Sequence, residues 1–220
     1  SAAKTAAKNA IDQAAKTKND AIDASNLTAE EKDALKKTVA GEVQTAKDNI
    51  DAATKDADVK TAQTSGEQAI NAVEIPASAA KTAAKNAIDQ AAKAKNDAID
   101  ASNLTAEEKA DLKKTVAGEV QTAKGNIDAA TKDADVTTAK NTGVGKINNI
   151  NVTSATKADA KAAIKQAAQT KDDAIDKSNL TDEEKADVKK QVAGEVQKAN
   201  AAIDAATKDA DVTTAKNTGV

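Results

Sequence analysis

The chain is built from one sequence unit that occurs three times. Residues 1–60 are identical to residues 78–137 at all but five positions, an offset of 77, and a more diverged copy follows at an offset of 76. A fixed period of this length is typical of repeat arrays, in which each unit packs mainly against its neighbours. We therefore predict three helical repeats, at 1–76, 77–152 and 153–220, the third of them truncated at its C-terminal end.

Each unit contains the same helix start. In the first unit it reads Asn26-Leu27-Thr28-Ala29-Glu30-Glu31-Lys32, and its counterparts begin at Asn103 and Asn179. A Thr followed three residues later by a Glu is a capping box, and two acids in the first turn suit the positive end of the helix dipole. A helical pattern also precedes each copy. The short connection between the two helices predicts an antiparallel helical hairpin with its tip at this motif.

Apolar residues step by three and four along three segments of each unit, which predicts three helices. In the first unit these helices span roughly residues 2–24, 29–55 and 59–73, with Asp58 as the N-cap of the third. With three helices that run up, down and up again, the chain enters a unit at one end and leaves it at the other. The predicted fold class is therefore all-α: tandem three-helix-bundle repeats stacked end to end into an elongated rod.

The third helix is too short to cover the whole hairpin of its own unit. The top of the first hairpin carries Ile22, Leu27, Leu35 and Val39. We expect the start of the next unit to cover this top, through Ala79, Ala83 and Ala87.

Glycine recurs inside two of the helices in every unit: Gly41, Gly118 and Gly194 in the second helix, and Gly66, Gly143 and Gly219 in the third. A glycine in a helix interior costs about 1 kcal/mol relative to alanine, so each needs a reason. We favour close approach between helices in an alanine-rich bundle. The alternative is a ligand that approaches the bare backbone.

The composition excludes most kinds of chemistry. The chain has no His, Cys, Met or aromatic residue, and all 32 basic residues are Lys. It therefore lacks the usual nucleophile–base pairs, zinc ligands and base-stacking side chains. A net charge of −3 with interspersed signs disfavours nucleic acid and anionic membrane as partners, and no apolar run approaches the roughly 20 residues needed to span a bilayer.

Three pairs of acids could in principle perform acid–base chemistry: Asp56 and Asp58, Glu30 and Glu31, and Asp172 and Asp173. We interpret them as helix caps and solvated faces. The Asp56–Asp58 turn also lacks the ligand spacing of an EF-hand calcium loop. The prediction is a protein that is not an enzyme, with no catalytic residue, no cofactor and no metal site.

The run from Lys85 to Val136 resembles the helical repeats of the domain-of-unknown-function family fifteen-forty-two. The shared features are the AID steps at 87–89 and 98–100, the LT-x-EEK cap and the IDAAT segment that ends the second helix. The resemblance covers essentially the whole chain. It implies an extracellular location in wall-anchored surface proteins of Gram-positive bacteria, where such repeats form long tandem arrays. It supplies no catalytic or ligand residue.

The predicted function is a structural spacer, a stalk that projects an adhesive domain from the cell wall, attached through regions outside this fragment. The expected partners are the neighbouring repeats, in a monomer. The alternative is an adhesin module that binds a host protein, or associates with itself between cells, through a helix face. A long intermolecular coiled coil is a rival architecture, against which stand the short hairpin tips and Pro76.

Overall fold

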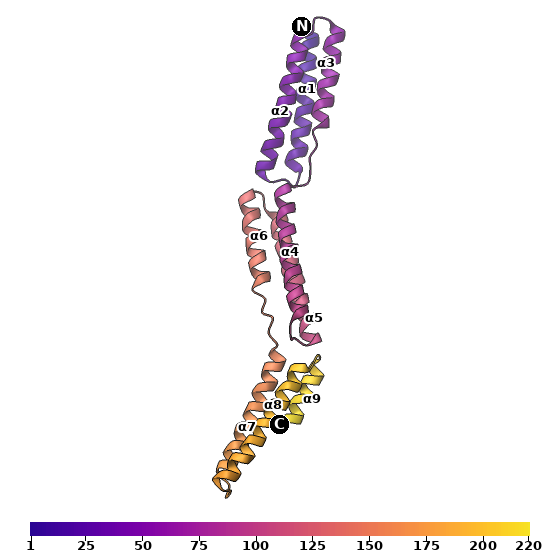
Figure 1. Cartoon of the computed structure of the whole chain (residues 1–220). Helices are drawn as coiled ribbons and strands as arrows, with labels where there is room; N and C mark the ends of the chain where they lie inside the picture. The colour runs from indigo at the N-terminus through magenta and orange to yellow at the C-terminus, as the bar shows by residue number, and fades with distance from the viewer. The chain divides into compact units, whose positions relative to one another are not determined.

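The computed structural model describes all 220 residues and contains nine α-helices and no strand (Figure 1). Each repeat contributes three helices, so the all-α fold class with tandem three-helix repeats is confirmed. The helices are α1 (Ala2–Ala24), α2 (Ala29–Ala52), α3 (Asp56–Ala72), α4 (Ala79–Ala101), α5 (Ala106–Ala129), α6 (Asp133–Asn148), α7 (Ala155–Asp176), α8 (Asp182–Ala205) and α9 (Asp209–Gly219). None of them is long and apolar enough to cross a membrane.

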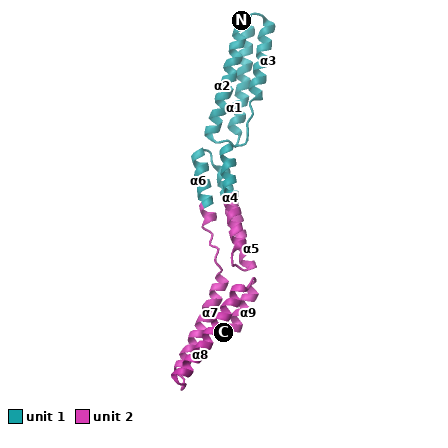
Figure 2. Cartoon of the chain, in the orientation of Figure 1, with its two compact units in different colours: residues 1–89, 121–144 teal, residues 90–120, 145–220 magenta.

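The chain forms two compact units, and the division between them passes through the second repeat (Figure 2). The first unit holds residues 1–89 and 121–144, which are the whole first repeat and the adjoining part of the second. The second unit holds residues 90–120 and 145–220, which are the remainder of the second repeat and the third. Each unit therefore contains one complete junction between two repeats.

The predicted capping boxes are present. The Glu31 N–H donates to Thr28 Oγ1 at 3.3 Å, and the Thr28 N–H donates to the Glu31 carboxylate at 3.0 Å. The third helix of the first repeat begins differently from the prediction. Lys55 is its N-cap and makes no side-chain bond, while Asp56 and Asp58 lie in the first turn. Helix α3 therefore starts three residues earlier than expected, and these acids interact with the helix dipole instead of capping the end.

The first repeat has a thin core made of one apolar stripe from each helix. Helices α1, α2 and α3 all contact one another. The buried residues are Ala7, Ile11, Ala15 and Ile22 of α1, Val39, Ala46 and Ile50 of α2, and Val59 and Ile70 of α3. Isoleucine supplies most of the large side chains that are fully buried in the chain. Alanine elsewhere in the stripes allows the helices to pack closely, as expected from the composition.

The two glycine series have different surroundings. A Cβ built at Gly66 would lie 2.5 Å from Ala46 Cβ and 2.8 Å from Ile11 Cδ1, so α3 packs too closely here for any side chain. The same contacts surround Gly143 and Gly219. A Cβ at Gly41 would meet nothing within 4 Å. Close helix approach is therefore confirmed for the third-helix glycines and is wrong for the second-helix glycines.

In the first two repeats the chain that follows the third helix covers the part of the hairpin around Val39 and Val116, so the expectation that Ala79, Ala83 and Ala87 cover it is wrong. Ala79 and Ala83 are exposed. The residues that pack there are Val73 and Ile75, which follow α3 in extended chain. An extended residue advances about 3.3 Å, against 1.5 Å in a helix. The few residues after α3 therefore span the height that the short helix leaves open, and the next repeat begins at the hairpin tip itself.

Candidate functional site: the repeat junctions and the groove of the third repeat

The junction in the first compact unit is built on the two acids of the capping motif. Glu31 uses one carboxylate oxygen for its own cap and accepts the Ala80 N–H on the other at 3.1 Å. Glu30 accepts the Asp133 N–H at 3.1 Å. The two donors are free N–H groups in the first turns of α4 and α6, which carry partial positive charge. One hairpin tip thus caps two helices of the next repeat.

Two further bonds complete this junction. The Ala29 N–H donates to the Thr131 carbonyl at 2.8 Å. Lys81, which is only 4% exposed, donates from Nζ to Asn26 Oδ1 at 2.9 Å and to the Asp128 carbonyl at 2.8 Å. The Lys81 ammonium therefore links the hairpin tip of the first repeat to the C-terminal end of α5 in the second.

The second compact unit contains the same junction one repeat later. Glu108 accepts the Thr105 N–H at 3.1 Å and the Thr156 N–H at 3.0 Å, and Glu107 accepts the Asp209 N–H at 3.2 Å. The other bonds recur as Ala106 N–H to the Thr207 carbonyl at 2.8 Å, and as Lys157 Nζ to Asn103 Oδ1 at 3.1 Å and to the Asp204 carbonyl at 2.8 Å. The junction is thus a repeated set of hydrogen bonds.

The junction carboxylates are held in their charged form. Partial burial of Glu108 opposes ionisation, but the hydrogen bonds that it accepts, chiefly from Thr156, outweigh this effect and lower its pKa to about 2. The pKa of Glu31 is lowered in the same way: burial raises it, and the bonds from Thr28 and Ala80 lower it by more. Both acids therefore bind the next repeat as carboxylates.

The tip of the third repeat has the same motif, and no further repeat lies beside it among these 220 residues. Glu184 accepts only the Thr181 N–H of its own capping box, at 2.8 Å. Thr181 is exposed, and Leu180 is 38% exposed, whereas the corresponding Leu27 and Leu104 are 4% and 5% exposed. The burial of these residues in the first two repeats therefore depends on the repeat that follows.

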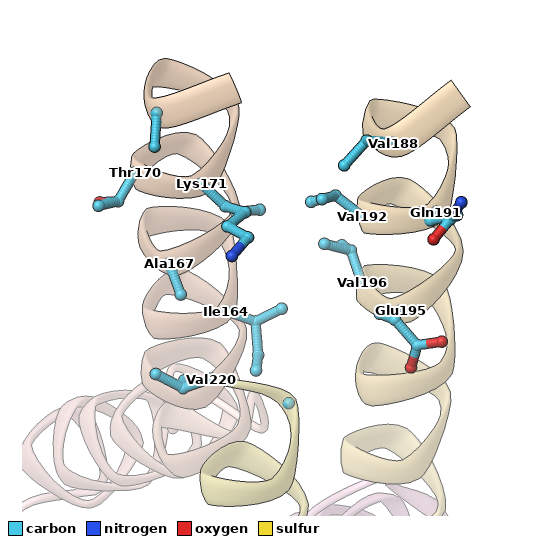
Figure 3. A pocket seen from close by; sticks show the side chains of 13 residues that line it. Ile164, Ala167, Thr170, Lys171, Val188, Gln191, Val192, Glu195, Val196 and Val220 are labelled. Carbon is cyan, nitrogen blue, oxygen red and sulfur yellow. The ribbon is translucent and has the colours of Figure 1, made fainter. Parts of the chain in front are cut away.

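An apolar groove of about 660 Å³ lies between α7 and α8 in the second compact unit (Figure 3). Ile164 and Ala167 of α7 line one wall, and Val188, Val192 and Val196 of α8 face them across it. Gly219 and Val220, at the end of α9, close one end of the groove.

The first two repeats fill the corresponding position themselves. Val192 is partly exposed, but its counterparts Val39 and Val116 are only 1% exposed. In the second repeat the cluster around Val116 is covered by Ile150 and Val152, which follow α6. The groove of the third repeat is therefore the place that the end of a third helix and the following extended chain occupy in the other two.

A lysine that interrupts the apolar stripe of each first helix has a specific role. Lys18 donates from Nζ to the carbonyls of Asn71 and Val73, at 2.9 and 2.8 Å. Lys95 donates in the same way to the carbonyls of Asn148 and Ile150, at 3.0 and 2.8 Å. These are the last carbonyls of the third helix and its continuation, at the negative end of the helix dipole. The counterpart in the third repeat, Lys171, lines the groove without such a partner.

The acid pairs considered for catalysis lie apart in the structure. Glu30 and Glu31 belong to the junction, and Asp56 and Asp58 are exposed in the first turn of α3. Asp173 accepts a hydrogen bond from Gln169 on the same helix at 2.9 Å. No group of three or more His, Cys, Asp or Glu side chains is placed to hold a metal ion. Sequence reasoning missed the junction role of Lys81 and Lys157. It also missed the carbonyl contacts of Lys18 and Lys95, although the recurrence of a lysine within the apolar stripe was a signal.

These features define an all-α tandem-repeat protein whose units are joined by a recurring junction. The chain matches the family described as Domain of Unknown Function (DUF1542) three times, at residues 3–78, 80–155 and 156–220. It therefore belongs to the DUF1542 family, as the sequence motifs indicated. No curated protein and no solved structure shows a significant match.

Proposed function

We propose that the chain is a structural spacer, a stalk segment of a bacterial cell-surface protein that carries an adhesive domain away from the cell wall. In this role the repeats supply length and a defined direction. The proposal assigns the chain no catalysis, cofactor or metal, and its partners are the adjoining repeats of the same polypeptide.

The observation that carries the proposal is the identity of the two junctions. Glu31 and Glu108 each bind the first turn of the next repeat, and Lys81 and Lys157 each connect the tip to the helix end beside it. Because both junctions use the same atoms, every added repeat is expected to dock in the same orientation. A series of identical docking steps increases reach by a constant amount for each repeat.

The test is the dependence of end-to-end distance on repeat number. Chains with two, three and six repeats would carry spin or fluorescent labels near both ends. A spacer with ordered junctions predicts a linear increase of about 40 Å per repeat, since 24 residues of α2 span roughly 36 Å. Growth with the square root of repeat number, as for a flexible linker, would refute the proposal.

A second candidate function is binding, to a host protein or to another copy between cells. Binding of host extracellular proteins to the purified chain at micromolar concentration would support the adhesin function. If the chain is only a spacer, it should bind none of these proteins, and its end-to-end distance should still increase linearly with repeat number.

A further inference from the structure

Each junction contains a lysine whose charge is buried where two repeats meet. Lys81 and Lys157 are each 4% exposed. The ammonium of Lys81 donates to Asn26 Oδ1 of the preceding tip at 2.9 Å and to the Asp128 carbonyl of its own repeat at 2.8 Å. Both acceptors are neutral oxygens, so no carboxylate offsets the loss of water around the charge. Such a lysine adds little net stability, and its presence in both junctions needs another reason.

The lysine is positioned by its own repeat before a tip binds. Lys4 is the counterpart of Lys81 in the first repeat, and no tip precedes it among these 220 residues. Its Nζ still donates to the Asp51 carbonyl, at 2.7 Å, as Lys81 donates to the Asp128 carbonyl. Lys4 is partly exposed, whereas Lys81 is buried. Docking of a tip therefore removes water from a lysine that is already in place, and the asparagine amide oxygen is the acceptor that the tip supplies in exchange.

The two sides of this contact respond differently to loss of the bond. Asn26 and Asp128 are exposed residues, so their oxygens can bind water if the lysine is absent. Lys81 is buried, so loss of the asparagine leaves a charged donor without that partner and without water. A buried charge left in this way destabilises a contact far more than removal of both partners does. The second junction has the same asymmetry between exposed acceptors and a buried lysine.

We propose that the junction lysine is a specificity-determining residue of the array. It accepts a tip only where an asparagine amide oxygen meets the ammonium. It rejects a tip that is displaced or that lacks this residue, because the charge would then be buried without its acceptor. The pairs are Asn26 with Lys81 and Asn103 with Lys157. The carboxylates of the tip supply the strength of the junction, and the lysine restricts the geometry in which it forms. This inference rests on the proposed spacer function, which requires one docking geometry at every junction.

A double-mutant cycle on the full chain tests this pairing. Asn26→Leu replaces the amide by an apolar group of similar shape, Lys81→Met keeps the aliphatic stem and removes the charge, and a third variant carries both substitutions. The readout is native-state exchange of the Ala80 amide, which donates to Glu31 of the tip at 3.1 Å. We expect exchange about 10–100 times faster in Asn26→Leu. In Lys81→Met and in the double variant, the rate should stay within about threefold of the unchanged protein.

Asn179→Leu is the matched control, because it makes the same change at a tip to which no junction lysine is bonded. It should leave the Ala80 rate as it is. It should change exchange of the Glu184 amide, which reports the cap of that tip, by less than about threefold.

Additive effects of Asn26→Leu and Lys81→Met would overturn the proposal. A loss of Ala80 protection in Lys81→Met as large as that in Asn26→Leu would also overturn it, because the lysine would then supply strength. If the cycle is additive while end-to-end distance still grows linearly with repeat number, the spacer function stands and only the role of the lysine is refuted.

Discussion

Replacement of Glu108 by Gln tests whether the junction depends on a carboxylate. Gln also functions at this position of a capping box, so the cap of α5 remains. The Thr156 N–H donates to the other carboxylate oxygen, Glu108 Oε1, at 3.0 Å. In the variant, one of the two acceptor oxygens becomes an amide donor that faces an N–H group. Glu184→Gln is the matched control, because Glu184 makes the cap without a following repeat.

The size of the effect follows from the pKa of Glu108. A decrease from 4.5 to about 2 corresponds to roughly 3 kcal/mol of preference for the charged form, at about 1.4 kcal/mol per unit. Part of this belongs to the cap, and the carboxylate remains partly in contact with water, which screens the interaction. We therefore expect Glu108→Gln to weaken the junction by about 1–2 kcal/mol.

Amide hydrogen exchange in the native protein measures this change at the junction itself. A loss of about 1–2 kcal/mol predicts exchange of the Thr156 amide that is roughly 5–30 times faster than in the unchanged protein. Glu184→Gln should leave the Thr156 rate as it is. Unchanged protection of Thr156 in Glu108→Gln, or an equal effect of both substitutions, would refute a junction held by the carboxylate.

Three further predictions use the repeats as controls for one another. Gly143→Ala should destabilise the chain by about 1–2 kcal/mol in urea unfolding, because the new Cβ clashes with α4 and α5, whereas Gly118→Ala should stabilise it by up to about 1 kcal/mol. Acid should weaken the second junction, because the pKa of Glu108 is lower in the folded state than in the unfolded state. The contribution of Glu108 to stability is complete above about pH 4.5 and is lost as the pH falls towards 2. Measurement of Thr156 amide exchange as a function of pH checks this prediction. Amides around Leu180 should exchange faster than those around Leu104, and equal protection would contradict a stabilising role of the following repeat.

The local features of this fold could be predicted from the sequence because short-range chemistry decides them. The Thr28 capping box and the bounds of α1 follow from residues within one or two turns. The start of α3 was misplaced because Asp56 and Asp58 suit either a cap or a first turn, and sequence alone does not separate the two.

The junction could not be predicted because its bonds join residues far apart in the chain. Glu31 was assigned to its cap, which uses only one of its carboxylate oxygens, and the second oxygen binds Ala80, 49 positions away. The extended chain through Val73 and Ile75 was missed for a related reason. The apolar residues of this segment have no helical or alternating period, so periodicity does not reveal its conformation. The reason for the extended chain is that α3 is shorter than the hairpin it packs against, and the following residues must span the remaining length.

The three copies separate local from neighbour-dependent structure. Thr28, Thr105 and Thr181 form the same capping box, yet only the first two are fully buried. The cap therefore forms without a following repeat, while burial of the tip requires one. Since the same tip both ends one hairpin and caps two helices of the next repeat, each repeat presents a preformed acceptor before its neighbour folds. An array of such units can then grow by local docking steps, with no contact required between distant repeats.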